Sequence, residues 1–136
     1  MKTLEDILDR IYALINKTSV TSLLDGRIYR HKKPLNDKLK NIVLTCLPLR
    51  PEVSFDNGNP LSQTGVIHAN CYAKNLTNGQ MDETSINAIM AAVILLIASS
   101  TTELFELQIS GQHIFIDPDE DDMSIGSIRI NYIIRS

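Results

Sequence analysis

Apolar residues recur at helical spacing in two segments of the chain. Over residues 3–16 they fall three and four positions apart, as on one face of a helix, and Thr3 is suited to cap its start. Residues 82–99 form a second predicted helix, which is apolar almost all round from Ile86 onwards. Such a helix must be covered on more than one side, by its own sheet and the first helix or by a neighbouring subunit.

Two segments between the helices have the pattern of strands. Residues 42–47 are apolar on both parities, which is typical of a strand covered on both faces. In residues 64–74 the odd positions are small and apolar and the even positions are mostly polar, as in a half-buried strand. A shorter strand is predicted at residues 27–30, after the turn signal Asp25-Gly26.

The chain closes with further strands. Residues 104–109 and 112–116 are predicted as two strands that pair through Ser110-Gly111. In the last strand every second residue is apolar or aromatic, which predicts the face that points inward. The residues of this inner face are Ile128, Ile130, Tyr132 and Ile134.

The order of these elements predicts an α+β fold, because it contains one crossover unit only. We expect one domain over residues 1–136, with a mixed, mostly antiparallel sheet of about four to six strands and two helices packed on one face. Residues 50–64 carry turn residues together with apolar Phe55 and Leu61. A protruding arm or long hairpin is therefore expected there.

Composition narrows the class of protein. Apolar residues make up 43% and charged residues 21%, which argues against a disordered or a membrane protein. The 13 Lys and Arg stand against 16 Asp and Glu, and Trp is absent, so specific nucleic-acid binding is not expected. The longest apolar run, residues 88–98, is too short to span a bilayer.

No catalytic or cofactor motif stands out, so we expect no enzyme, no cofactor and no metal. Cys71 lies three residues from His68, which on a strand sets the two side chains on opposite faces, and Cys46 has no histidine nearby. The chain has no zinc-ligand spacing and no glycine-rich phosphate loop. A rival interpretation is a small ligand-binding or catalytic domain that uses His68, Asn70 and Tyr72, which share one strand face.

Charged residues cluster in two places. Asp117–Asp122 is acidic, yet it lacks the Gly and the Glu that a calcium loop needs at its sixth and twelfth positions. We interpret it as a solvated turn that would gain from a cationic partner. The second cluster holds six cations within residues 27–40. They are Arg27, Arg30, Lys32, Lys33, Lys38 and Lys40.

Three interpretations of the cations remain open: a solvated strand edge, phosphate contact, and contact with another protein surface. The third includes the acidic turn of a neighbouring copy, in a head-to-tail interface that can close into a ring. In that hypothesis one set of residues faces another across the interface. Arg27, Arg30, Lys32 and Lys33 face Asp119, Glu120, Asp121 and Asp122, and Phe55 and Leu61 anchor contact with the next subunit.

The chain as a whole resembles a known family. The features in order are a helix, Gly26-Arg27-Ile28-Tyr29, the strand over residues 42–47, a strand ending in Tyr72-Ala73-Lys74, an Ala-rich helix and the Asp117–Asp122 turn before the closing strand. This order resembles the tail-completion, or tail-terminator, proteins of long-tailed phages and prophages. The sequence departs from the family pattern at Leu39-Lys40-Asn41, where a Pro-Phe/Tyr-Pro-Tyr-like entry is common, and in its long arm.

The resemblance implies a non-enzymatic virion structural protein of the tail or neck, assembled in the cytoplasm of the host bacterium. Family members form rings, typically hexameric, that cap the finished tail tube and present a surface to the head connector. The partners that the resemblance implies are therefore copies of the chain, the tail-tube protein and head-connector proteins, with no membrane involved.

Overall fold

The first helix, α1 (Leu4–Ile15), begins at a capping box. The Thr3 hydroxyl accepts a hydrogen bond from the Asp6 N–H, and the Asp6 carboxylate accepts one from the Thr3 N–H, both at 3.1 Å. Ile7, Leu8 and Ile11 are buried on one face of the helix, as the apolar spacing predicted. A single turn, α2 (Thr18–Thr21), follows it.

The structure is a computed structural model that describes residues 3–46, 52–56 and 59–135, without the side chains of residues 52–56 and 59–61. Its strands form one mixed sheet in the order β1-β2-β4-β6-β5, with β3 paired to β4 off this path. β1 runs parallel to β2, and the other pairs are antiparallel. The strands are β1 (Ile28–Arg30), β2 (Asn41–Cys46), β3 (Glu52–Asp56), β4 (Asn59–Lys74), β5 (Phe105–Ile116) and β6 (Met123–Arg135).

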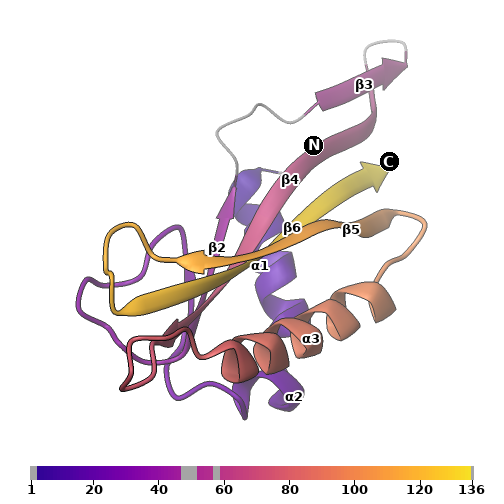
Figure 1. Ribbon diagram of the computed structural model, residues 1–136. Helices are drawn as coiled ribbons and strands as arrows, with labels where there is room; N and C mark the ends of the chain where they lie inside the picture. The colour runs from indigo at the N-terminus through magenta and orange to yellow at the C-terminus, as the bar shows by residue number, and fades with distance from the viewer. Residues whose placement is uncertain (1–2, 47–51, 57–58, 136) are drawn as a thin grey trace.

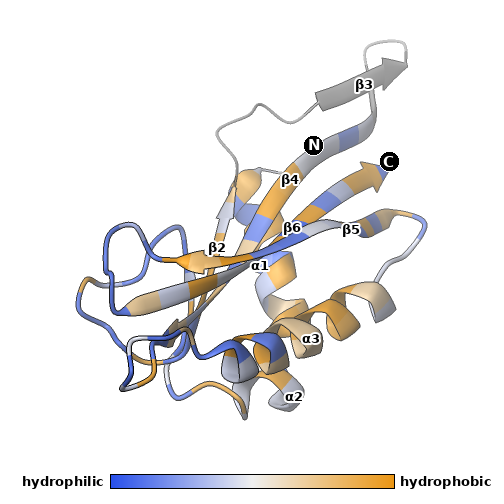
Figure 2. Cartoon of the chain, in the orientation of Figure 1, coloured by the Kyte–Doolittle hydropathy of each residue, from blue (hydrophilic) through white to orange (hydrophobic). Residues whose placement is uncertain are grey.

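Both long helices, α1 and α3 (Glu83–Ser99), lie on one face of the sheet (Figure 1). From Ile67 to Ala73 the odd residues of β4 point to this face, and Ile67, Ala69 and Cys71 are fully buried there. Hydrophobic and hydrophilic residues alternate along β4 and β6 (Figure 2), because one face of each strand meets the helices. The predicted α+β fold, with its mostly antiparallel sheet and helices on one face, is confirmed.

The predicted hairpin at Ser110-Gly111 is wrong. β5 is one continuous strand that pairs with β6 along its whole length, and the register shifts between Ile109 and Gly111. Ser110 is therefore the extra residue of a β-bulge and not part of a turn. The physical reason is the length of β6, whose 13 residues pair with both halves of β5.

The segment after residue 51 is a hairpin of β3 and the first part of β4. Residues 62–64 of β4 pair with β3 on one edge and with β6 on the other, so the hairpin continues the main sheet. In Figure 1, β3 stands at the far end of β4, away from the helices. The side chains of Phe55 and Leu61, expected as anchors, lie outside the described residues.

Candidate functional site

The basic segment after β1 and the acidic turn between β5 and β6 meet in the folded chain, and both lie at the same end of the sheet in Figure 1. Lys38 Nζ lies 2.9 Å from Glu120 Oε2 and 2.7 Å from Asp122 Oδ1. Lys33 Nζ lies 3.5 Å from Glu120 Oε1. We call Lys33, Lys38, Glu120 and Asp122 the ion-pair cluster.

The centre of the ion-pair cluster is buried. The side chains of Lys33 and Glu120 are 7% and 9% exposed. Lys33 Nζ also donates to the Asp37 carbonyl at 3.0 Å and lies 5.2 Å from the centre of the Tyr72 ring. Glu120 accepts a further hydrogen bond from the Asn36 N–H at 3.1 Å. Each buried charge is thus hydrogen-bonded, which burial of a charge requires.

These contacts revise one part of the interface hypothesis. Lys33, Glu120 and Asp122 were expected to face a neighbouring copy, but they are partnered within the same chain. Arg30 likewise forms an ion pair with Asp9 of α1. The sequence missed the pairing because more than 80 residues separate its partners. The remaining candidates, Arg27, Lys32, Asp119 and Asp121, have exposed side chains.

Local backbone geometry shapes the basic segment. His31 and Asn36 adopt φ values of 68° and 66°, in the left-handed region that turns use. The His31 N–H donates to the Leu44 carbonyl at 2.7 Å, and the Leu39 N–H donates to Asp37 Oδ1 at 3.1 Å. These bonds hold the lysines of the segment over the sheet.

A hollow of about 260 Å³ lies between the two charged segments and the sheet. Tyr72 and Val43 lie at the sheet side, and Lys33, Asp117 and Glu120 are among the charged residues around it. Since the charges of both signs neutralise one another there, the hollow does not select a strongly charged ligand. Phosphate contact through this segment loses support for the same reason.

His68, Asn70 and Tyr72 share the sheet face opposite the helices, as predicted, and Cys71 lies on the helix face. Burial and then the charge of Arg129 lower the pKa of His68. Asn70 Oδ1 is buried without a hydrogen-bond partner among the described residues. His68 and Asn70 do not line the hollow beside Tyr72, so the three residues do not share that hollow.

Neither cysteine has the environment of a nucleophile. Burial raises the pKa of Cys71 to about 12, and burial and then the charge of Glu5 raise the pKa of Cys46. A thiol with a raised pKa stays protonated at neutral pH and reacts slowly. Both cysteines therefore fit the predicted role of small hydrophobic residues.

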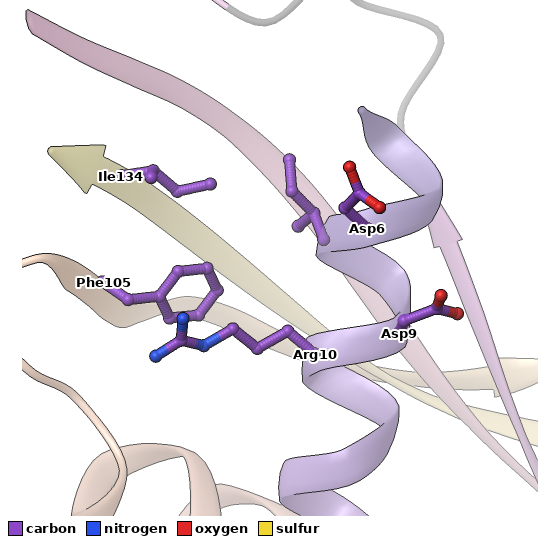
Figure 3. A pocket seen from close by; sticks show the side chains of 6 residues that line it. Asp6, Asp9, Arg10, Phe105 and Ile134 are labelled. Atoms are coloured by element: carbon purple, nitrogen blue, oxygen red, sulfur yellow. The ribbon is translucent and has the colours of Figure 1, made fainter. Parts of the chain in front are cut away.

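A second hollow, of about 320 Å³, lies between α1 and the ends of β5 and β6 (Figure 3). Its apolar wall is formed by Ile7, Phe105 and Ile134. The Arg10 guanidinium lies 4.3 Å from the centre of the Phe105 ring, whereas Asp9 points away from Phe105. Arg10 thus covers an aromatic core residue in a cation–π contact.

Within residues 3–46, 52–56 and 59–135, no group of three or more His, Cys, Asp or Glu could hold a metal ion. In the same part of the chain, no helix has the length and apolarity to cross a membrane. The ion-pair cluster joins the basic segment to the acidic turn, and Lys33 lies over Tyr72 of the sheet.

The ion-pair cluster makes the stability of the fold depend on pH. The hydrogen bond from Lys38 lowers the pKa of Glu120 below its ordinary value of 4.5 and that of Asp122 below 3.8. A carboxyl with a lower pKa in the folded chain stabilises the fold above its unfolded pKa, and this contribution is lost as pH falls through the folded pKa.

We therefore expect the free energy of unfolding to fall below pH 4.5, measured by urea unfolding across a pH series. The variant Glu120→Gln should show a weaker acid dependence, and equal pH dependence of the free energy of unfolding in both proteins would contradict the assignment.

At the alkaline end, hydrogen bonds to Asp122 and then Glu120 raise the pKa of Lys38 above 10.5. The contribution of Lys38 to the free energy of unfolding is therefore lost as pH rises beyond that value.

The arrangement of helices and strands recurs in solved protein structures. No protein-family model matches the chain, and no curated protein matches it either. One solved structure, whose name describes no function, covers 99% of this chain and 98% of its own, with a TM-score of 0.56 and 10% sequence identity. At this identity the likeness supports the fold alone.

Proposed function

We propose that the chain is a virion structural protein of a long-tailed phage or prophage, which forms a ring that caps the tail tube and joins tail to head. Its partners in this proposal are copies of itself, in a ring that is hexameric by the family resemblance, the tail-tube protein and the head-connector proteins. It works in the tail or neck of the virion and is assembled in the host bacterial cytoplasm. It makes and breaks no covalent bonds.

The observation that carries the proposal is the outward face of α3. Glu83 is the only charged residue of this helix of 17 residues. Its exposed positions after the first turn include Ala88, Ala91, Leu95 and Ala98, and the Leu95 side chain is 69% exposed. Leu104, just beyond the helix, is 63% exposed. A contiguous uncharged apolar strip on a soluble protein marks a contact surface, because water contact with it is unfavourable.

The function is tested by electron microscopy of phage particles assembled with and without the gene. Without it, we expect tails of irregular length that are not joined to heads. The variant Leu95→Glu should reproduce this defect, because burial of an unpaired charge in a protein contact is costly. The matched control is Thr77→Glu, which adds the same charge at an exposed loop position.

Tails of normal length joined to heads in the absence of the gene would overturn the proposed function. If the Leu95→Glu variant gave normal particles, the α3 face would not be a contact surface of the assembly. Thermal unfolding of both purified variants shows whether either substitution affects the fold itself.

A second candidate function, ligand binding on the open face of the sheet, is favoured by Asn70 Oδ1, which is buried without a partner among the described residues. Such an atom would accept a hydrogen bond from a small polar ligand. Nuclear magnetic resonance of the purified protein with a library of small polar compounds tests this. Shifts confined to His68, Asn70 and Tyr72 favour the second candidate over assembly.

A further inference from the structure

β5 forms one long edge of the sheet, and described residues cover only part of it. β5 has 12 residues, about 40 Å, and it pairs with β6 alone. Natural proteins protect such edges with lysines, prolines or inward charges. From Leu107 to Ile116 the strand has no charged residue and no proline, and its one irregularity is the bulge at Ser110.

The two halves of this edge differ. In the first half, the Leu107 N–H donates to Thr101 Oγ1 at 2.9 Å, and the Phe105 carbonyl accepts from the Thr102 N–H at 2.9 Å. The segment after α3 therefore occupies outward backbone groups of Phe105 and Leu107. The second half, Gly111–Ile116, has no such cover among the described residues.

The pattern of backbone hydrogen bonds between β5 and β6 identifies which N–H and carbonyl groups of Gly111–Ile116 point outward. The Asp117 N–H donates to the Met123 carbonyl, and residues of an antiparallel strand alternate between bonding inward and outward. Gly111, His113 and Phe115 therefore bond to β6, and Gln112 and Ile114 present their N–H and carbonyl groups outward, as does Ile116. This edge is a ready acceptor for one more strand.

The chain also carries a strand that fits this edge. β3 pairs with β4 alone among the described strands, and its five residues are one fewer than those of the Gly111–Ile116 half. Residues 62–64 of β4 pair with β3 at one lateral edge and with β6 at the other. Because β5 follows β6 in the strand order, β3 and β5 lie at opposite lateral edges of the sheet. A head-to-tail contact between copies requires two different edges at opposite margins of the sheet, and no described residue covers the outer edge of β3 or of Gly111–Ile116.

Charge argues against β3 pairing with itself. In an antiparallel β3–β3 ladder centred on Ser54, Glu52 of one copy would stand opposite Asp56 of the other. Like charges directly opposite destabilise a ladder. The uncharged half of β5 presents no such repulsion to β3.

We propose that Gly111–Ile116 of β5 accepts β3 of a neighbouring copy as an added strand, so that the sheet continues head to tail around the ring. This inference rests on the proposed function and identifies the surface that closes the ring. Backbone hydrogen bonds supply the contact, and the opposite placement of the two edges sets its direction.

The test exploits the outward N–H of Gln112. Gln112→Pro removes that donor and leaves the bonding of Gly111 and His113 to β6 in place, since edge strands tolerate proline where the N–H faces solvent. Gln112→Thr, the matched control, changes the exposed side chain and keeps the N–H. By native mass spectrometry over a dilution series, we expect Gln112→Pro to weaken ring assembly by about tenfold or more and Gln112→Thr by less than about threefold.

A crosslinking experiment does not depend on how well the proline variant folds. Ser54→Cys is combined in turn with Gln112→Cys and with His113→Cys, which samples both faces of the added strand. Under oxidation we expect a ladder of linked copies in at least one double variant and no species beyond a dimer in the single variants.

Each outcome is decisive. Rings that resist Gln112→Pro, with no crosslinked ladder, would overturn this inference and leave the proposed function standing. If Gln112→Cys alone formed a disulfide-linked dimer as readily as the double variants formed the ladder, the strand added to β5 would be β5 of the second copy and not β3. A wild-type chain that forms no ring, either in solution or on tail tubes, would overturn both the inference and the proposed function.

Discussion

Replacing Gly126 with alanine is expected to lower the free energy of unfolding by about 3 kcal/mol. Gly126 lies in β6 where α3 crosses it, and a Cβ atom there would lie 2.4 Å from Ile86 Cγ2 and 2.4 Å from Met90 Sδ. The thioether of Met90 can move, but the branched Ile86 side chain is fully buried and restricted at χ1. The helix must therefore shift away from the sheet.

The matched control for Gly126→Ala is Gly111→Ala. A Cβ atom at Gly111 meets nothing within 4 Å, so this variant should stay within about 0.5 kcal/mol of the wild type. Urea unfolding followed by circular dichroism measures both. In a double-mutant cycle, Met90→Ala should recover part of the loss at Gly126, because it makes room for the added methyl group. Equal stability of the two glycine variants would contradict the close packing of α3 on β6.

Replacing Glu120 with alanine is expected to lower the free energy of unfolding by about 2 kcal/mol. The substitution removes the carboxylate that accepts from Lys33, Lys38 and the Asn36 N–H. Lys33 then remains buried with the Asp37 carbonyl as its remaining acceptor among the described residues. A buried charge that loses its counter-charge destabilises the fold more than the pair itself stabilises it.

The matched control for Glu120→Ala is Asp121→Ala, which removes an acid of the same turn whose side chain is exposed. We expect a change within about 0.5 kcal/mol for this control. The Glu120 variant should also show a weaker acid dependence than the wild type, with the part due to the Lys38–Asp122 pair remaining. If both substitutions had the same effect, the cluster would be an ordinary surface pairing.

The sequence alone was sufficient for the local elements. The spacing of Ile7, Leu8 and Ile11 defines the buried face of α1, and the alternation around Ile67 and Ala69 defines the buried face of β4. Such patterns can be read from the chain because a helix and a strand each repeat with a fixed period. The fold class followed from the order of these elements.

Sequence reasoning was insufficient where the outcome depended on a distant partner. Ser110-Gly111 has the composition of a turn, and only the pairing of both flanking segments with β6 makes it a bulge. Taken alone, the basic segment and the acidic turn each have the charge pattern of a surface that binds another molecule. Folding brings Lys38 to Glu120 and Asp122 across more than 80 residues of chain.

The sequence by itself thus determined the two long helices, most of the strands and the faces that they bury, because these depend on the periodicity of neighbouring residues. The tertiary structure alone decided the order of the strands, the partners of the charged residues and the parts of the strand edges that no described residue covers. Those features depend on contacts between segments far apart in the chain, for which local periodicity carries no signal.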